Sequence, residues 1–236
     1  MDPRPCRFSA ALDEARSAGR RPLIAEIKVK SPKEGDLLAG RDPVILARHM
    51  VDAGAACLSV VTEGPHFGGS SELLRAVATA VPVPILRKDF VTEPAQVWET
   101  RALGASCLLL MVAMLEWPRL VELHEEARRC GIETLVEVHD EQELDQALTL
   151  DLDLLGINNR DIRQLEMDDG GPSKTLELVR RVPAGVRVVS ESAIGSPAQA
   201  QALVAAGAAG LLVGTAILRA SDVGEAVSRF AMGEVV

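Results

Sequence analysis

Single charged or amide side chains stand at or next to the ends of several apolar runs in this sequence. Lys28 and Lys88 follow two runs rich in β-branched residues. Three later runs end on or beside Glu137, Asn158 and Glu191. A charge at the end of a buried strand is costly to desolvate unless it is paired or takes part in function. The pattern therefore predicts that several strands direct ionisable or amide groups toward one place.

Two lysines and up to three carboxyl groups in one cavity could work as acids and bases. Neighbouring charges shift one another's pKa values, so that one group keeps a proton at a pH where another has lost it. Glu26, two residues before Lys28, would point inward one layer below. For any single residue an internal salt bridge explains the charge equally well. For five strand ends together we favour a catalytic site.

Eight apolar, strand-like runs alternate with segments of helical periodicity. The runs lie at about 23–28, 56–61, 84–88, 106–112, 133–138, 153–157, 187–191 and 209–213. Asp42-Pro43 is typical of a helix start, and Gly54 is typical of the end of the same helix. Eight such units predict an α/β fold of the (β/α)8, or TIM, barrel type, in which active-site residues lie at the carboxyl ends of the strands.

A doubly wound open sheet is the alternative fold. Eight units fill a barrel with none left over, and no GxGxxG follows the first run, as a Rossmann fold would need. We therefore expect one (β/α)8 domain over residues 1–236. Residues 1–22 would form a short N-terminal extension with a helix from Ser9 to Ala18. The sequence indicates no second domain, linker or low-complexity segment.

The last two units carry small residues where their strands end. Ser190-Glu-Ser192-Ala193 follows the seventh run, and Gly214-Thr215 leads from the eighth run into a helix. Small residues let backbone N–H groups approach an anion, and the loops after strands seven and eight are the usual phosphate site of this barrel. Ordinary tight turns are the alternative. We favour a phosphorylated small-molecule substrate.

The composition argues against several classes of partner. A formal net charge of −9 speaks against nucleic acid and against an anionic membrane surface. The longest apolar run, 107–115, is too short to span a bilayer, and the N-terminus lacks the apolar core of a signal peptide. Four widely spaced cysteines form no CxxC pair, so we expect reduced thiols in a cytoplasmic protein; they are Cys6, Cys57, Cys107 and Cys130.

The other candidate residues are weaker. The four histidines have no spacing typical of metal ligands, and we expect no metal site. His139 follows a strand beside Asp140, where we expect an ordinary loop histidine. The glycine-rich segment 64–70 could fold over the mouth of the barrel as a lid or could simply make a turn, and both interpretations stay open.

Seven segments in order resemble the indole-3-glycerol phosphate synthase family, the (β/α)8 enzymes of tryptophan biosynthesis. They are Ile24-Ala-Glu-Ile-Lys28 with Ser31-Pro32, Phe67-Gly-Gly-Ser70, Arg87-Lys-Asp-Phe90, Arg101-Ala-Leu-Gly-Ala105, Leu135-Val-Glu-Val-His-Asp140, Gly156-Ile-Asn-Asn-Arg-Asp161 and Ser190-Glu-Ser192. The resemblance covers nearly all of the chain from about 23 to 222. It implies a carboxy-lyase without a cofactor, which converts 1-(2-carboxyphenylamino)-1-deoxyribulose 5-phosphate to indole-3-glycerol phosphate, CO₂ and water.

The resemblance also implies a role for each matching residue. Lys88 would protonate the substrate carbonyl, Lys28 would pair with the substrate's carboxylate or phosphate, and Glu137 would serve the dehydration. Glu26 and Asn158 would orient the lysines and the substrate hydroxyls. The implied substrate-binding residues are Ser31 and Phe90 at the anthranilate end, Arg160, Glu191 and Ser192 at the ribulose-phosphate end, and Ala193, Gly214 and Thr215 at the phosphate.

The sequence departs from the family pattern at three places. Ala193 stands where the family usually has glycine, and its methyl group would crowd the phosphate or change the backbone angle. Thr215 replaces the usual serine or glutamate, which is a milder change. The segment before the first strand is short, where the family commonly has a longer helical extension that helps to cover the mouth.

Two other functions stay open at this point. A related phosphate-binding barrel, such as a phosphoribosylanthranilate isomerase-like enzyme, is disfavoured by the set of Lys28, Lys88 and Glu137. A non-catalytic paralogue, which would bind a phosphometabolite or act as a scaffold, is supported by Ala193 and by the short N-terminal segment. The synthase is the function that we expect, and association with other tryptophan-pathway enzymes is a further partner that the resemblance suggests.

Overall fold

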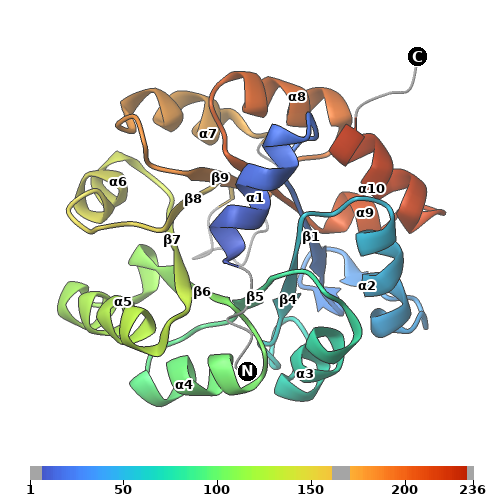
Figure 1. Ribbon diagram of the computed structural model, residues 1–236, viewed down its shortest axis with the longest axis horizontal. Helices are drawn as coiled ribbons and strands as arrows, with labels where there is room; N and C mark the ends of the chain where they lie inside the picture. The colour runs from blue at the N-terminus through green and yellow to red at the C-terminus, as the bar shows by residue number, and fades with distance from the viewer. Residues whose placement is uncertain (1–6, 161–170, 233–236) are drawn as a thin grey trace.

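Eight parallel strands close into a barrel in the computed structural model, which describes residues 7–160 and 171–232 (Figure 1). Around the barrel the strands are β1 (Leu23–Ile27), β10 (Gly210–Val213), β9 (Val188–Glu191), β8 (Leu154–Asn158), β7 (Glu133–Val138), β6 (Cys107–Met111), β5 (Ile85–Lys88) and β4 (Cys57–Val61). Every predicted strand is present, with its ends within one residue of the predicted ones. The barrel is confirmed, and the open-sheet alternative is wrong.

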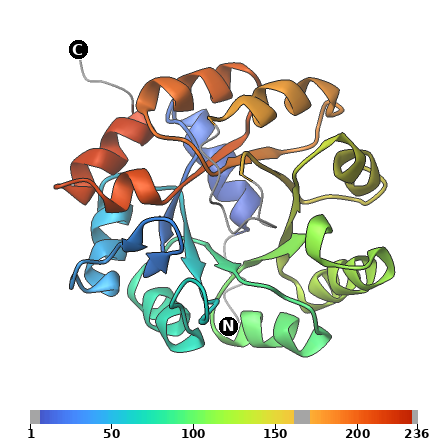
Figure 2. The same ribbon diagram turned by 180° about the vertical axis from the view of Figure 1, so that it is seen from behind.

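Helices surround this barrel, and a small hairpin lies beside its mouth (Figure 2). The helices are α2 (Pro43–Asp52), α3 (Ser71–Ala80), α4 (Pro94–Ala102), α5 (Trp117–Cys130), α6 (Glu141–Ala147), α7 (Ser173–Leu178), α8 (Pro197–Ala205), α9 (Thr215–Leu218) and α10 (Val223–Met232), with 3₁₀ turns η1 (Val112–Met114) and η3 (Val179–Arg181). The hairpin consists of β2 (Lys30–Ser31) and β3 (Gly35–Asp36). Within residues 7–160 and 171–232, no helix is long and apolar enough to cross a membrane.

Local signals in the sequence set the helix ends. The Asp42 carboxylate accepts hydrogen bonds from the backbone N–H groups of Val44 and Ile45, at 2.7 and 3.3 Å, and thereby caps α2. The same helix is followed by Gly54, whose φ of +107° lies in the region that favours glycine. The predicted start and end of this helix are therefore both observed.

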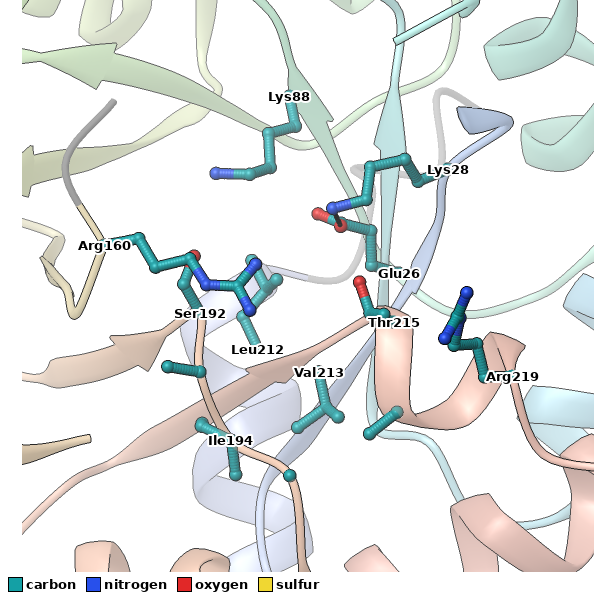
Figure 3. Close-up of a pocket in the computed structure, with 14 residues that line it drawn as sticks. Glu26, Lys28, Lys88, Arg160, Ser192, Ile194, Leu212, Val213, Thr215 and Arg219 are labelled. Atoms are coloured by element: carbon teal, nitrogen blue, oxygen red, sulfur yellow. Dashed lines mark ion pairs between the residues drawn. The ribbon is translucent and has the colours of Figure 1, made fainter. Parts of the chain in front are cut away.

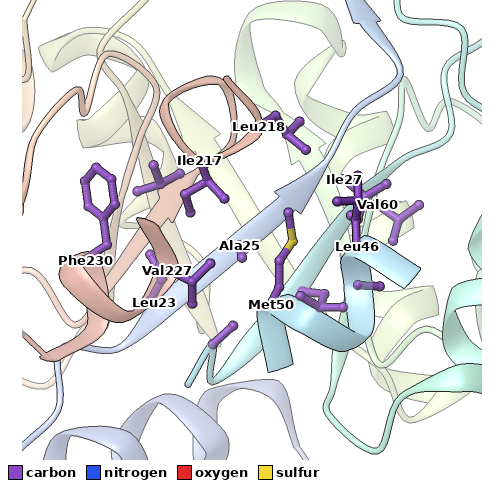
Figure 4. Packing of buried hydrophobic residues seen from close by; sticks show 14 of the residues in the cluster. Leu23, Ala25, Ile27, Leu46, Met50, Val60, Ile217, Leu218, Val227 and Phe230 are labelled. Carbon is purple, nitrogen blue, oxygen red and sulfur yellow. The ribbon is translucent and has the colours of Figure 1, made fainter. Parts of the chain in front are cut away.

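The side chains of β1 alternate between the helical shell and the barrel interior. Leu23, Ala25 and Ile27 face outward, where they pack in one apolar cluster with Met50 of α2 and Phe230 of α10 (Figure 4). The intervening side chains face the interior. Because side chains alternate along a strand, the shell fixes which residues point inward, and a slip by one residue would bury the wrong set.

The lower part of the barrel interior is apolar. Its fully or almost fully buried members include Ile24, Cys57, Leu86, Cys107, Leu109, Leu135, Leu154, Val189 and Leu212. The charged interior residues of the mouth lie above this layer, toward the carboxyl ends of the strands, and the buried Glu133 lies below it, at the start of β7. The apolar layer therefore forms a solid floor beneath the mouth, as expected for a filled (β/α)8 barrel.

Helix α1 (Phe8–Ser17) closes the end of the barrel opposite the mouth (Figure 1). Phe8 and Leu12 are fully buried and belong to the same cluster as the apolar floor. The backbone N–H and hydroxyl of Ser9 donate to the carboxylate of Glu133, the first residue of β7, at 3.0 and 2.5 Å. The predicted helix is confirmed to within one residue. The described part of the N-terminal segment lies below the barrel and does not cover the mouth.

We expect Leu12→Ala to lower the free energy of unfolding by about 2–5 kcal/mol, because it leaves a cavity in the barrel floor. The matched control is Glu14→Ala on the exposed face of the same helix, with an expected change within about 0.5 kcal/mol. Urea denaturation followed by far-UV circular dichroism measures both. Equal effects of the two substitutions would show that α1 does not pack against the floor in solution.

Candidate active site

Lys88, Glu137 and Glu191 meet at the carboxyl ends of β5, β7 and β9. The Nζ atom of Lys88 lies 3.3 Å from Oε2 of Glu137 and 3.1 Å from Oε2 of Glu191. Both glutamates are fully buried, and the side chain of Lys88 is 14% exposed. Three residues that are far apart in the sequence thus form one ion cluster, in which a single ammonium group lies between two carboxyl groups.

A second cluster lies around Lys28, directly after β1, two strands away from β5. Its Nζ atom is 3.1 Å from Oε1 of Glu26, and the hydroxyl of Ser59 donates to Oε2 of Glu26 at 3.3 Å. Glu26 is buried in the interior, as its place two residues before Lys28 predicts. In Figure 3 the side chains of Lys28 and Lys88 extend from different strands into the same cavity, with Arg160 opposite.

Two glycines make room for the buried carboxyl groups. A Cβ atom on Gly156 of β8 would lie 2.1 Å from Oε1 of Glu191, far closer than any non-bonded contact. A Cβ atom on Gly214, after β10, would lie 2.6 Å from Oε1 of Glu26. The absence of a side chain on a neighbouring strand therefore lets each carboxyl group occupy the barrel interior.

The two carboxyl groups beside Lys88 differ in their tendency to hold a proton. Burial alone would raise the pKa of Glu137, but the charge of Lys88, together with the hydrogen bond and charge of His139, holds that pKa well below its usual range. Burial raises the pKa of Glu191, and the negative charge of Glu137 raises it further. The positive charge of Lys88 lowers this pKa but does not cancel the increase. At neutral pH Glu137 is therefore a carboxylate and Glu191 a carboxylic acid, which is an arrangement of one base and one acid.

His139 lies in the loop after β7, as predicted, but it is buried and belongs to this cluster. Its Nε2 atom lies 3.3 Å from Oε1 of Glu137, and its Nδ1 atom lies 3.1 Å from Oε2 of Glu143. Only 4% of the residue is exposed. The side chain of His139 points in the same direction as Glu137, two residues earlier, and this spacing was the signal available in the sequence.

A cavity of about 290 Å³ extends from the two lysines to the loops after β9 and β10 (Figure 3). The predicted residues in its wall are Glu26, Lys28, Lys88, Arg160, Ser192, Ala193, Gly214 and Thr215. Arg219 also lines it and was missed, although it lies four residues after Thr215 and hence one turn further along. Cationic side chains and the backbone of two loops thus surround one end of the cavity, which is suited to an anion.

A narrower, apolar recess of about 30 Å³ adjoins this cavity, and both are lined by Lys28 and Lys88. Phe90, as predicted, and Phe67 form part of its wall. Phe67 comes from the glycine-rich segment, in which a Cβ atom on Gly69 would lie 2.1 Å from the backbone oxygen of Val61. This segment therefore makes a tight turn against β4 and at the same time supplies a wall of the recess.

Four predicted site residues line neither the cavity nor the recess: Ser31, Asn158, Glu191 and Glu137, which is fully enclosed beside Lys88. Ser31 is buried in the hairpin, where its hydroxyl accepts a hydrogen bond from the backbone N–H of Glu34 at 3.0 Å. Asn158 is buried below the mouth and accepts from the backbone N–H of Arg160 at 3.0 Å. Glu191 lies within the acid–base cluster and not in the cavity wall at the ribulose-phosphate end, where the resemblance placed it.

Ser192 and Ala193 adopt left-handed backbone conformations, with φ angles of +62° and +56°. The chain therefore keeps at Ala193 a backbone angle that glycine adopts without cost, even though an alanine stands there. An L-residue in this region is strained by about 1–2 kcal/mol.

We expect Ala193→Gly to raise the free energy of unfolding by about 0.5–1 kcal/mol, since glycine removes the strain but makes the unfolded chain more flexible. The matched control is Ala202→Gly, which makes the same replacement at an exposed position inside α8. That variant should lose about 0.5–1 kcal/mol. Urea denaturation checks the opposite signs, and a destabilised Ala193→Gly protein would contradict the left-handed conformation.

We expect Gly156→Ala to lower the free energy of unfolding by about 1–3 kcal/mol, because the added methyl group overlaps the carboxyl group of Glu191. Gly171→Ala is the matched control, since nothing lies within 4 Å of a Cβ atom there. In a Glu191→Ala background the same Gly156→Ala substitution should cost clearly less, as a double-mutant cycle would show. If Gly156→Ala lowered the free energy of unfolding by the same amount in that background, the added methyl group would not clash with Glu191.

The fold and the mouth together define a (β/α)8-barrel enzyme whose acid–base groups lie at the carboxyl ends of its strands. In the part of the chain that the structure describes, no group of three or more His, Cys, Asp or Glu residues is arranged to hold a metal ion. The family model of indole-3-glycerol phosphate synthase matches residues 1–230. The chain belongs to the indole-3-glycerol phosphate synthase family.

Relatives with this name are similar to the chain over most of its length. A protein of Azospirillum brasilense is 43% identical over 219 residues, which are 93% of this chain and 82% of that protein. One of Pyrococcus furiosus is 42% identical over 221 residues, which are 93% of this chain and 96% of that protein. Both are named indole-3-glycerol phosphate synthase.

More distant solved structures share the fold alone. The 3-hexulose-6-phosphate synthase of Salmonella typhimurium superposes with a TM-score of 0.72 at 15% sequence identity, covering 89% of this chain and 96% of that one. A thiamine phosphate pyrophosphorylase of Pyrococcus furiosus gives a TM-score of 0.64, also at 15% identity, over 89% and 93% of the two chains.

Proposed function

We propose that this protein converts 1-(2-carboxyphenylamino)-1-deoxyribulose 5-phosphate to indole-3-glycerol phosphate, with release of CO₂ and water. The observation that carries the proposal is the cluster of Lys88 with Glu137 and Glu191, in which Lys88 lines both a cationic cavity and an apolar recess. Relatives at 40–43% identity carry the name of this enzyme.

The two adjoining cavities fit the two ends of this substrate. The phosphate takes the cationic end, near Arg160, Arg219 and the backbone at Ala193 and Gly214. The aromatic ring takes the recess beside Phe90. Since Lys28 and Lys88 line both cavities, the reacting carbonyl lies between the two lysines, and Lys28 is available to pair with the ring carboxylate.

Ring closure needs an acid at the carbonyl oxygen. Lys88 donates this proton as the aromatic carbon attacks the carbonyl carbon, so that a C–C bond forms and the carbonyl oxygen becomes a hydroxyl group. The C–CO₂ bond then breaks, and its electron pair returns to the aromatic ring. Because these electrons stay within the substrate, the proposal includes no redox cofactor and no external electron acceptor.

Dehydration needs both an acid and a base. Glu191 holds the proton with which the hydroxyl group leaves as water, and Glu137 accepts the proton that the neighbouring carbon loses as the indole forms. Glu26 orients Lys28, and Asn158 lies beside Glu137. Over the whole reaction, the substrate loses CO₂ and one molecule of water and takes up one proton. The aromatic ring is restored when CO₂ leaves.

The proposal also covers the partners and the location of the enzyme. Its substrate is a small phosphorylated molecule, and neither nucleic acid nor a membrane takes part. We place the enzyme in the cytoplasm, consistent with the buried thiols of Cys57, Cys107 and Cys130. Association with other tryptophan-pathway enzymes is part of the same proposal.

We expect Lys88→Ala to lower kcat about 10²- to 10⁴-fold, the usual contribution of a general acid. The measurement is the rise of indole fluorescence with the carboxyphenylamino substrate, against a low background from two tryptophans and no tyrosine. Lys174→Ala on α7 is the matched control, because Lys174 lines neither the cavity nor the recess, and should keep full turnover.

Two results would contradict the proposal. Full turnover by a folded Lys88→Ala protein would remove Lys88 from the role of acid. Absence of turnover in the unaltered protein, with the substrate still bound in a calorimetric titration, would favour the non-catalytic paralogue. Circular dichroism of each variant verifies that the barrel is folded.

A further inference from the structure

Two buried carboxyl groups share one lysine, yet they differ in charge. Lys88 lies 3.3 Å from Glu137 and 3.1 Å from Glu191, so its distance to the two groups is nearly the same. Burial is also the same, since both glutamates are fully enclosed. Neither Lys88 nor burial therefore decides which of the two groups is the base and which is the acid.

Two neighbours, His139 and Asn158, lower the pKa of Glu137 and not that of Glu191, and His139 is the one of the two that can carry a charge. Its Nε2 atom lies 3.3 Å from Oε1 of Glu137, whereas Lys88 contacts the other oxygen, Oε2. Glu137 thus has a nitrogen atom of a basic side chain within 3.3 Å of each of its two oxygens. The corresponding Oε1 atom of Glu191 lies instead against the backbone of Gly156.

Glu143 holds the imidazole ring of His139 in this position. One oxygen of Glu143, Oε2, lies 3.1 Å from Nδ1 of the ring and accepts the backbone N–H of His139 at 2.8 Å. Glu143 stands in the first turn of α6, and Asp140 caps this helix by accepting the N–H of Glu143 at 2.9 Å. The ring is therefore fixed between two carboxylates by the start of a helix.

The surroundings of the ring favour its charged form. Glu137 faces it from β7 and Glu143 faces it from α6, whereas η1, which packs against both elements, has the sequence Val-Ala-Met and carries no titratable side chain. Burial lowers the pKa of His139, but its hydrogen bonds to Glu137 and Glu143 and the charges of these groups raise the pKa to about 9. The ring is thus an imidazolium at neutral pH.

We propose that His139 is a positioning residue that makes Glu137 the base of the site and leaves the proton on Glu191. Held by Glu143, it fixes one oxygen of Glu137, places a positive charge behind it, and keeps the other oxygen directed at Lys88. This inference rests on the proposed function for its catalytic consequence. The contacts of the ring with Glu137 and Glu143, which favour its charged form, do not depend on that function.

The two amide replacements of His139 separate charge from hydrogen bonding. In His139→Gln an amide N–H group reaches toward Glu137 without a positive charge, and in His139→Asn the shorter amide keeps a donor toward Glu143 only. Loss of the positive charge raises the pKa of Glu137 toward that of Glu191, so that the base becomes protonated at a higher pH. The acid limb of the kcat profile should move upward by about one pH unit or more.

The experiment is the pH profile of kcat and of kcat/KM with the carboxyphenylamino substrate. Because Glu137 loses the group that fixes its Oε1 atom, we expect kcat at neutral pH to fall at least about tenfold in His139→Asn and less in His139→Gln, with KM almost unchanged. Glu143→Gln should move the acid limb in the same direction by a smaller amount. His124→Gln is the matched control, a buried histidine whose partners, the Thr134 hydroxyl and the Asp151 carbonyl, are uncharged.

A second measurement is independent of turnover. In NMR titrations of the unaltered protein, the imidazole signal of His139, assigned with the His139→Gln variant, should titrate above pH 8, and Glu137→Gln should lower this value. Titration in the ordinary range near 6.5 would overturn the inference, as would an unshifted acid limb in both His139 variants. Absence of turnover in the unaltered protein overturns the proposed function instead, and the NMR result then still tests the charge of His139.

Discussion

The structure of the mouth depends on the burial of Lys88 between Glu137 and Glu191. Two fully enclosed carboxyl groups would each be costly without a cation, and an ammonium group at this depth would be costly without them. The burial of these three groups together needs side chains from three strands and a glycine at position 156, where a side chain would overlap Glu191. It also needs a further partner for Glu137, which is His139. A change in any one of these leaves a charge or a polar atom of the others buried without compensation.

Along the barrel axis, the residues that stabilise the fold and the charged residues of the candidate site lie at opposite ends. Below the mouth the interior is apolar, and α1 seals the lower end through Phe8, Leu12 and the pair of Ser9 with Glu133. Apart from Glu133, the charged interior residues that the structure describes lie toward the carboxyl ends of the strands. The apolar layer and the helical shell hold the strands in register. The charged residues at the mouth can therefore be placed for acid–base chemistry without contributing to the packing of the floor.

The charge of the cavity is a local property that opposes that of the whole chain. The formal net charge is −9, yet Lys28, Arg160 and Arg219 surround one cavity. Two of these cations have carboxylate partners nearby: Lys28 lies 3.1 Å from Glu26, and Arg219 lies 3.0 Å from Glu34 of the hairpin. These pairs hold the cations in place at the mouth before an anionic substrate arrives, which reduces the ordering that binding requires.

The sequence by itself determined the strands, the helix ends and most of the charged strand ends, because apolar periodicity, Asp42 as a cap and Gly54 after a helix act locally. It also identified the residues that converge at the mouth, since the carboxyl ends of parallel strands meet there. Only the tertiary structure decided that Ser31 belongs to the hairpin, that Glu191 joins Lys88, and that His139 contacts Glu137. These assignments depend on distances of a few ångströms between residues on separate elements and on which neighbouring position is empty, and neither quantity is encoded in the local pattern of a single segment.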